Sequence, residues 1–309
     1  MIISKKPENK NYFFEKYLYY PNARTGMREV LNVIKNSHKT ITILLPAYIG
    51  WSPNEGSGIY DPIIDLKINH EFYHLDDQLK INEQDLKNKI TQTEGPKVLL
   101  LVHYFGYVDP SYQKLCEYAK KNNCFIVEDA AHALFTSLVD QRCGLYGDAI
   151  FYSLHKMLPM NNGGMVKVFN TDLKIKESCL NSKNLFNYNF TGIAQKRKRN
   201  ARIIEETLTR THIKNIEFLR PIEIFSQQTP QTYPIIIKNK DRTQLYFQMN
   251  EAGYGVVSLY HTLIESLRNS RYTQENKVSQ TILNLPVHQD IKEEELISMC
   301  KQLEVFLDE

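Results

Sequence analysis

Residues 127–168 read VEDAAHALFTSLVDQRCGLYGDAIFYSLHKMLPMNNGGMVKV and contain two apolar runs of strand length, each followed by polar residues. The first run ends at Asp129, and the second, which starts at Ala149, leads into Ser153-Leu154-His155-Lys156. In an α/β sheet, ligands bind at the carboxyl ends of the strands. The sequence therefore predicts that a carboxylate and a lysine face one crevice.

Outside this stretch, apolar runs of strand length alternate with amphipathic stretches of helix length, which is typical of an α/β protein with a largely parallel sheet. A helix over 109–123 connects two of the expected strands, with Asp109 and Pro110 suited to its start. The clearest expected strands are 40–45, 98–102, 125–127, 149–152 and 165–169. The irregular stretch 52–76 is expected to form a loop over a site.

The pattern changes after about residue 185, where helices are expected at 192–210 and 241–252 and strands at 230–237 and 254–259. A capping box, Asp290 followed by Glu293, is expected to begin the last helix. We therefore expect a large domain over 1–190 and a smaller C-terminal α+β domain over 191–309.

Composition excludes several classes of protein. With 309 residues, 42% hydrophobic and 24% charged, the chain can bury a core, and it is neither disordered nor a disulfide miniprotein. Its net charge of +3 gives no reason to expect a nucleic-acid partner, and the basic run 195–202 is expected to be a solvated helix face. No segment resembles a membrane span or a signal peptide, so a cytoplasmic location is expected.

The cysteines do not suggest a metal site. Five are present, an odd and scattered set without a C-x-x-C pair, which argues against zinc and against a disulfide framework. His103, His132 and His155 lie on separate predicted loops without ligand spacing, so no metal is expected. The cysteines are expected to be reduced packing residues: Cys116, Cys124, Cys143, Cys179 and Cys300.

A lysine and a carboxylate at one crevice suit a particular cofactor chemistry. A lysine amine can form a Schiff base with an aldehyde, and a buried carboxylate can keep the pyridine nitrogen of pyridoxal 5'-phosphate protonated. An aspartate at a strand end and a lysine on a loop are surface features in most proteins. These two residues alone therefore leave the cofactor hypothesis open.

The wider sequence resembles the DegT/DnrJ/EryC1/StrS family of pyridoxal-phosphate sugar aminotransferases along nearly its whole length. The family patterns E-D-x-A, G-x-x-G-D, a serine-to-lysine loop and G-G are similar to residues 128–131, 144–148, 153–156 and 163–164 here. The resemblance implies that Lys156 is the Schiff-base lysine and that Asp129 binds the pyridine nitrogen. It also implies that His132 lies near the phenolic oxygen of the cofactor and Ser153 near its phosphate.

Weaker similarities lie on both sides of this region. The family's phosphate-binding helix start corresponds to Asn22–Met27, which implies phosphate contacts from Arg24 and Thr25, although an ordinary helix start with a solvated arginine fits equally well. Residues 46–51 resemble V-P-x-x-T-F, whose aromatic residue stacks on the cofactor. The expected position is glycine here, so Trp51 is the candidate, with Tyr48 behind it. Asn189 matches an asparagine that reaches the neighbouring subunit's cofactor.

The resemblance implies a fold and an activity. The fold would be the type I fold of PLP-dependent transferases, with a mostly parallel central sheet and a small C-terminal domain, in a homodimer with shared active sites. The activity would be transfer of an amino group, with glutamate as the expected donor, to a nucleotide-linked keto-sugar. Two alternatives stay open: another PLP-dependent reaction such as dehydration, and a non-catalytic PLP-binding sensor. The shortened chain and the threonine at 191 put the nucleotide-sugar substrate in doubt.

Overall fold

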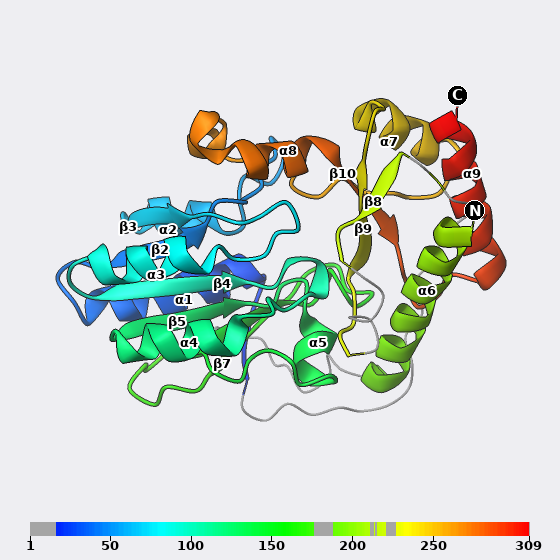
Figure 1. Ribbon diagram of the computed structural model, residues 1–309. Helices are drawn as coiled ribbons and strands as arrows, with labels where there is room; N and C mark the ends of the chain where they lie inside the picture. The colour runs from blue at the N-terminus through cyan, green and yellow to red at the C-terminus, as the bar shows by residue number, and fades with distance from the viewer. Residues whose placement is uncertain (1–16, 176–187, 211–212, 214, 221–226, 309) are drawn as a thin grey trace.

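The computed structural model describes residues 17–175, 188–210, 213, 215–220 and 227–308, which fold around two sheets (Figure 1). The larger sheet has the order β1-β7-β6-β5-β4-β2-β3, and its neighbours from β3 to β6 are parallel. Only β7 runs against the others. The strands are β1 (Leu18–Tyr20), β2 (Thr42–Pro46), β3 (Asn69–Tyr73), β4 (Lys97–Val102), β5 (Cys124–Asp129), β6 (Ala149–Ser153) and β7 (Gly164–Val168).

Helices cover both faces of this sheet, which explains why its strands are continuous apolar runs. Helix α1 packs on β6 and β7, whereas α4 packs on β5 with α3 beside it (Figure 1). The helices are α1 (Ala23–Asn36), α2 (Tyr60–Asp65), α3 (Glu83–Gln92), α4 (Tyr112–Lys121) and α5 (Leu134–Leu138), with a short 3-10 turn, η1 (Tyr104–Gly106), after β4. The predicted α/β architecture with a mostly parallel central sheet is confirmed.

The second sheet is antiparallel, with the order β10-β9-β8. The long helix α6 and the last helix α9 pack against each other beside it (Figure 1). Its strands are β8 (Ile216–Phe218), β9 (Thr232–Ile237) and β10 (Ile282–Pro286), and the helices are α6 (Phe190–Arg210), α7 (Arg242–Glu251), α8 (Thr273–Thr281) and α9 (Glu293–Asp308), with 3-10 turns η4 (Glu265–Leu267) and η5 (Ser270–Tyr272). The boundary near residue 190 stays a prediction.

A segment between α7 and α8 returns to the large sheet. A bridge joins Gly50 to Leu263, and the N–H groups of Trp51 and Ile264 donate to the carbonyls of Thr262 and Ile49, each over 2.9 Å. These bonds fix the C-terminal segment against the chain that leaves β2. The loop after β2 therefore has a wall that comes from the last fifth of the sequence.

Three sequence predictions are wrong in detail. Residues 254–259 form no strand, because Val257 makes only an isolated bridge to Asn284. The stretch 52–76 is a loop only at its start, since α2 and β3 lie within it. The last helix begins two residues later than the capping box implied, and the Lys292 N–H donates to Glu295 Oε2 over 2.9 Å.

The basic run 195–202 is also not simply a solvated face. Arg197 is completely buried under α6, where its guanidinium donates to the Gln231 carbonyl over 3.0 Å. Lys198 pairs with Asp140, and Arg199 pairs with Glu293 over 2.7 Å. The prediction of a solvated face holds for the exposed residues of the run, and it is wrong for Arg197, which is buried, and for Lys198, which is half-buried. The exposed residues are Gln195, Lys196, Arg199 and Arg202.

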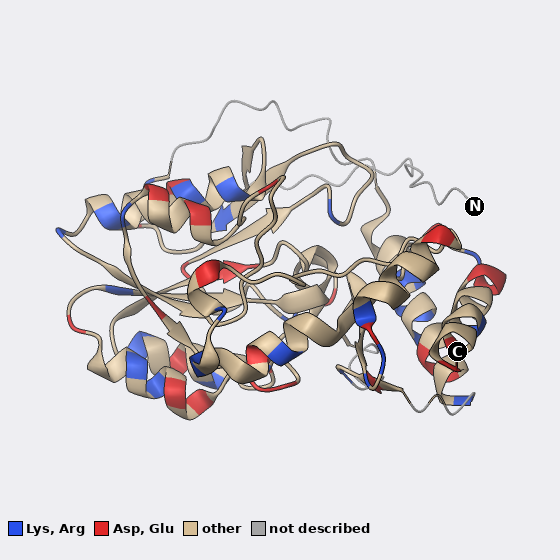
Figure 2. Cartoon of the chain, turned by 90° about the horizontal axis from the view of Figure 1, so that it is seen from above, with Lys and Arg blue, Asp and Glu red and all other residues tan. Residues whose placement is uncertain are grey.

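Charge and sulfur distribution fit a packed α/β protein. Both basic and acidic residues are spread over the helices (Figure 2). Four cysteines, all except Cys179, are buried and unpaired, and Cys179 lies outside the described residues. Within the described ranges, no helix is both long enough and apolar enough to cross a bilayer.

Candidate active site

A cavity of about 600 Å³ opens at the carboxyl ends of β2, β5 and β6, where ligands bind in α/β sheets. Five segments build its wall: the start of α1, the loop after β2, the end of β5, the end of β6, and the returning C-terminal segment. The site residues predicted from sequence that line it are Arg24, Trp51, Asp129, His132, Ser153 and Lys156.

Lys156 and His132 are in direct contact inside this cavity. Lys156 Nζ lies 3.0 Å from His132 Nε2, and the Phe105 N–H donates to His132 Nδ1 over 3.3 Å. A neutral imidazole that accepts at Nδ1 carries its proton on Nε2. That proton points at Lys156 Nζ, so the contact requires a lone pair on the lysine nitrogen. The geometry therefore selects the unprotonated amine.

Burial favours the same protonation states. Desolvation lowers the pKa of Lys156, an effect that Asp129 and Glu55 oppose and Arg24 assists. Desolvation also lowers the pKa of His132 well below its usual value, helped by the Lys156 charge. Because a lysine is nucleophilic only as the free amine, a lowered pKa prepares Lys156 to attack a carbonyl carbon.

Asp129 is the last residue of β5 and is 5% exposed. Its Oδ1 accepts the Ala131 N–H over 2.8 Å, and among the described residues no donor is bonded to Oδ2. Burial raises the pKa of Asp129, while Ala131, Lys156 and His103 lower it in part. A buried carboxylate with one unused oxygen is suited to a cationic N–H group from a ligand.

The residues predicted at the phosphate end are only partly brought together. Ser153 Oγ lines the cavity 3.3 Å from His155 Nδ1. Arg24 also lines it, but its guanidinium donates to the Glu55 carbonyl over 2.5 Å and pairs with Asp61 at 3.4 Å. The Thr25 hydroxyl donates to Asn22 Oδ1, which caps α1, and does not line the cavity.

The predicted aromatic residues lie at different depths. Trp51 lines the cavity and is 40% exposed, whereas Tyr48 is fully buried behind the wall. Asn189 does not line this cavity, and its Oδ1 accepts the Gly192 N–H at the start of α6.

Sequence reasoning missed part of the wall. Glu55 lies on the loop after β2, while Tyr260 and His261 come from the returning segment. One signal for Tyr260 was present in the sequence, namely the glycine at position 50 where an aromatic residue was expected. Nothing in the sequence indicated which aromatic residue would fill that space.

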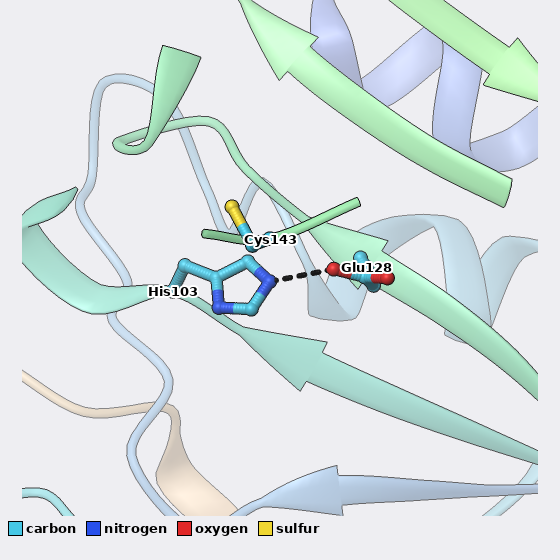
Figure 3. A group of neighbouring side chains, drawn as sticks. All are labelled: His103, Glu128 and Cys143. Atoms are coloured by element: carbon cyan, nitrogen blue, oxygen red, sulfur yellow. Dashed lines mark hydrogen bonds and ion pairs between the residues drawn. The ribbon is translucent and has the colours of Figure 1, made fainter. Parts of the chain in front are cut away.

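A second cluster lies behind the site, where His103, Glu128 and Cys143 come together (Figure 3). His103 Nε2 is 2.9 Å from Glu128 Oε2. Glu128 also accepts bonds from Tyr112 and from the N–H groups of Gly144 and Gly147, all within 2.9 Å. Its two oxygens are thus each occupied by two donors, so the carboxylate holds the 144–147 loop in place and has no lone pair left for a metal.

Comparison with known proteins shows what this part of the chain is similar to. The model of the DegT/DnrJ/EryC1/StrS aminotransferase family matches residues 62–190, the part of the chain that contains Asp129, His132, Lys156 and Asn189. The predicted family resemblance is confirmed. The DegT/DnrJ/EryC1/StrS match stops short of Arg24, Trp51 and Tyr260, so these three wall residues rest on the geometry of this chain.

Curated proteins that are similar to this chain include GDP-perosamine synthases from two organisms. The protein from Vibrio cholerae is 30% identical over 110 residues, which cover 35% of this chain and 29% of that protein. The protein from Escherichia coli O157:H7 is 22% identical over 258 residues, 74% of this chain and 70% of that protein. The first alignment therefore spans less than a third of its relative.

Solved structures extend the likeness to the whole fold. NtdA from Bacillus subtilis, solved with bound PMP, has a TM-score of 0.75 at 14% identity, and the alignment covers 97% of this chain and 74% of NtdA. This confirms the predicted type I fold of PLP-dependent transferases.

Proposed function

We propose that this protein is a pyridoxal-phosphate-dependent aminotransferase that acts on a keto-sugar. The observation that carries the proposal is the pair formed by Lys156 and Asp129, which line one cavity at the carboxyl ends of parallel strands. One supplies an amine whose pKa is lowered by burial, and the other a largely buried carboxylate with an unused oxygen.

The residues present fit the cofactor. Asp129 lines the cavity, and its Oδ2 would accept the pyridine N–H, because among the described residues no donor is bonded to this oxygen. His132, whose Nε2 lies 3.0 Å from Lys156 Nζ, would hydrogen-bond the phenolic oxygen of the cofactor. Ser153 and Arg24 are the proposed phosphate contacts, with Thr25 on the same helix start and Trp51 beside the ring.

Bound pyridoxal phosphate supplies an electron sink that stabilises negative charge at the substrate carbon next to the transferred nitrogen. Lys156 would hold the cofactor covalently and, once displaced by the donor amine, carry a proton with Nζ. His132 orients that nitrogen, because its Nε2–H is directed at it over 3.0 Å. Asp129 would keep the pyridine nitrogen protonated.

The sugar acceptor is proposed from the names of the relatives, which include GDP-perosamine synthases. A nucleotide-linked keto-sugar as acceptor, glutamate as donor, and a cytoplasmic homodimer are the finer parts of the proposal. A dimer is supported by Asn189, which lies away from its own chain's cavity and so is available to a partner's site.

The first experiment tests the lysine. Borohydride treatment of the protein loaded with pyridoxal phosphate should trap the cofactor covalently, and Lys156→Ala should abolish the trapped adduct in mass spectrometry. Lys167→Ala is the matched control, since this half-buried lysine on β7 does not line the cavity and should leave trapping unchanged. Full trapping in Lys156→Ala would contradict the assignment.

The second experiment separates an enzyme from a sensor. Glutamate added to the loaded protein should remove the yellow absorbance of the aldehyde form as the amino group moves to the cofactor. A ketose linked to a nucleotide should then restore it. A colour that persists with glutamate would favour the non-catalytic alternative.

A further inference from the structure

Tyr260 belongs to the segment that returns from the C-terminal part of the chain, and it lines the cavity that contains Lys156 and Asp129. Its ring centroid lies 5.8 Å from that of His132, the residue in contact with Lys156 Nζ. Burial first, and then the charge of Asp129, raises the pKa of the Tyr260 hydroxyl well above its usual value. The side chain therefore presents a neutral aromatic ring at the centre of the site.

The ring occupies the space left by a missing side chain. A Cβ atom added to Gly50 would lie 2.6 Å from Tyr260 Cδ1 and 3.2 Å from Tyr260 Cα. The first distance is shorter than any real Cβ contact, and the second involves backbone that cannot move freely. The Tyr260 ring can therefore occupy this space only because residue 50 is glycine. Position 50 is also where an aromatic side chain was expected from the sequence.

Several contacts hold the Tyr260 ring in this position next to Gly50. The rings of Tyr48, Tyr104 and Phe105 lie 5.3, 5.6 and 6.0 Å from that of Tyr260. Ser279 Oγ donates to the Tyr260 carbonyl over 2.6 Å. The backbone of Tyr260 has φ of 60°, a left-handed conformation that is rare for a bulky residue and persists only where its surroundings enforce it.

We propose that Tyr260, seated over Gly50, is the aromatic residue against which the cofactor ring packs. The inference rests on the proposed function, since it assumes that pyridoxal phosphate binds between Lys156 and Asp129. An electron-poor pyridinium ring packs favourably on the face of a tyrosine. Trp51 is 40% exposed and lies at the mouth of the cavity, so it contributes less to the same contact.

The test is the affinity of the apo protein for pyridoxal phosphate, followed by quenching of protein fluorescence and by cofactor absorbance. Tyr260→Leu should weaken binding about tenfold or more, which corresponds to roughly 1.4 kcal/mol. Tyr260→Phe keeps the ring and should bind within about threefold of the wild type, because stacking depends on the ring face. Trp51→Leu should lose less affinity than Tyr260→Leu.

Gly50→Ala provides an independent variant, since it displaces the ring without removing it and should weaken binding as Tyr260→Leu does. Tyr118→Leu, a half-buried tyrosine on α4 outside the cavity, is the matched control for loss of a ring. Thermal unfolding of each apo variant shows whether the fold is intact.

Three results would overturn the inference. They are unchanged affinity in a folded Tyr260→Leu variant, an equal loss in Tyr260→Phe, and unchanged affinity in Gly50→Ala. Absence of any trapped cofactor in the wild type would instead show that the proposed function fails, and the inference with it.

Discussion

Glu128 is a single residue on which a whole loop depends. It is completely buried, and it accepts bonds from His103, Tyr112, Gly144 and Gly147. Glu128→Gln replaces a charged acceptor with an amide whose NH2 group faces donors. We expect a loss of about 3 kcal/mol in the free energy of unfolding, as when one partner of a buried pair is removed.

Urea titration of the wild type and the variant measures this loss. Glu293→Gln is the control, because its ion pair with Arg199 is about half exposed on both sides and should be worth less than ~1 kcal/mol. Equal losses in the two variants would contradict the role of Glu128.

The partner of Glu128 predicts a pH dependence. Burial lowers the pKa of His103, but Cys143 and Glu128 outweigh this effect and raise the pKa from its usual 6.5 to about 10. The folded state therefore keeps a proton that the unfolded chain releases. This stabilisation is fully present below pH 6.5 and is lost as the pH rises through about 10.

We thus expect the stability advantage of the wild type over His103→Gln to shrink between pH 7 and pH 10. Chemical denaturation at several pH values measures it. An advantage that stays constant or grows with pH would show that His103 is neutral in the folded protein.

Single site residues were predicted most accurately from sequence where a reactive side chain follows a clear strand pattern. Lys156 and Asp129 each follow an apolar strand, so strand patterning alone placed them at one edge of the sheet. Tyr260 had no such signal, because its place depends on backbone bonds between residues 49–51 and 262–264. Contacts between residues this far apart in the sequence depend on tertiary packing and leave no pattern in the local sequence.

At the level of elements, the close approach of α1 to β7 fixes the start of the cavity wall. A Cβ atom on Gly164, the first residue of β7, would overlap the backbone of Asn22 and Ala23 at the start of α1. Gly164→Ala should therefore cost about 2 kcal/mol of stability and weaken cofactor binding, because backbone must shift.

Gly58→Ala is the matched control for this prediction. Gly58 lies in the loop that lines the same cavity, but an added Cβ would meet nothing within 4 Å. Thermal unfolding and cofactor titration of both variants make the comparison. If Gly164→Ala behaved like Gly58→Ala, the approach of α1 to β7 would be looser than the structure indicates.

The elements that sequence located well are those with one dominant periodicity. The buried strands β2, β4, β5, β6 and β7 were all expected, within about three residues at each end. Residues 254–259 carried the composition of a strand but pair with β10 through a single bridge, between Val257 and Asn284. The start of α9 was misplaced because Glu295 also suits the capping position that Glu293 was given.

For the whole molecule, the proposed shared active sites predict a complementation result. If Asn189 contributes to the partner's site, each site contains Lys156 from one subunit and Asn189 from the other. Asn189→Ala and Lys156→Ala then each remove one of these two residues. Dimers formed from one of each contain one intact site and one site with both lesions. Mixing the two variants should restore cofactor trapping in roughly a quarter of all sites.

Analytical ultracentrifugation shows whether the mixed dimers form, and neither variant alone should approach wild-type retention of cofactor. Mixing that restores nothing, while mixed dimers are present, would place Asn189 outside the partner's site. Retention by Asn189→Ala alone at the wild-type level would do the same.

The backbone bonds between residues 49–51 and 262–264 also bear on how the protein matures. A nascent chain that ends after β7 already contains Lys156 and Asp129. It still lacks Tyr260, which lines the same cavity. If pyridoxal phosphate binds between Lys156 and Asp129, its capture would come late in biogenesis, after residues 262–264 have paired with residues 49–51. Truncation before residue 260 would then leave an open cavity that binds the cofactor weakly.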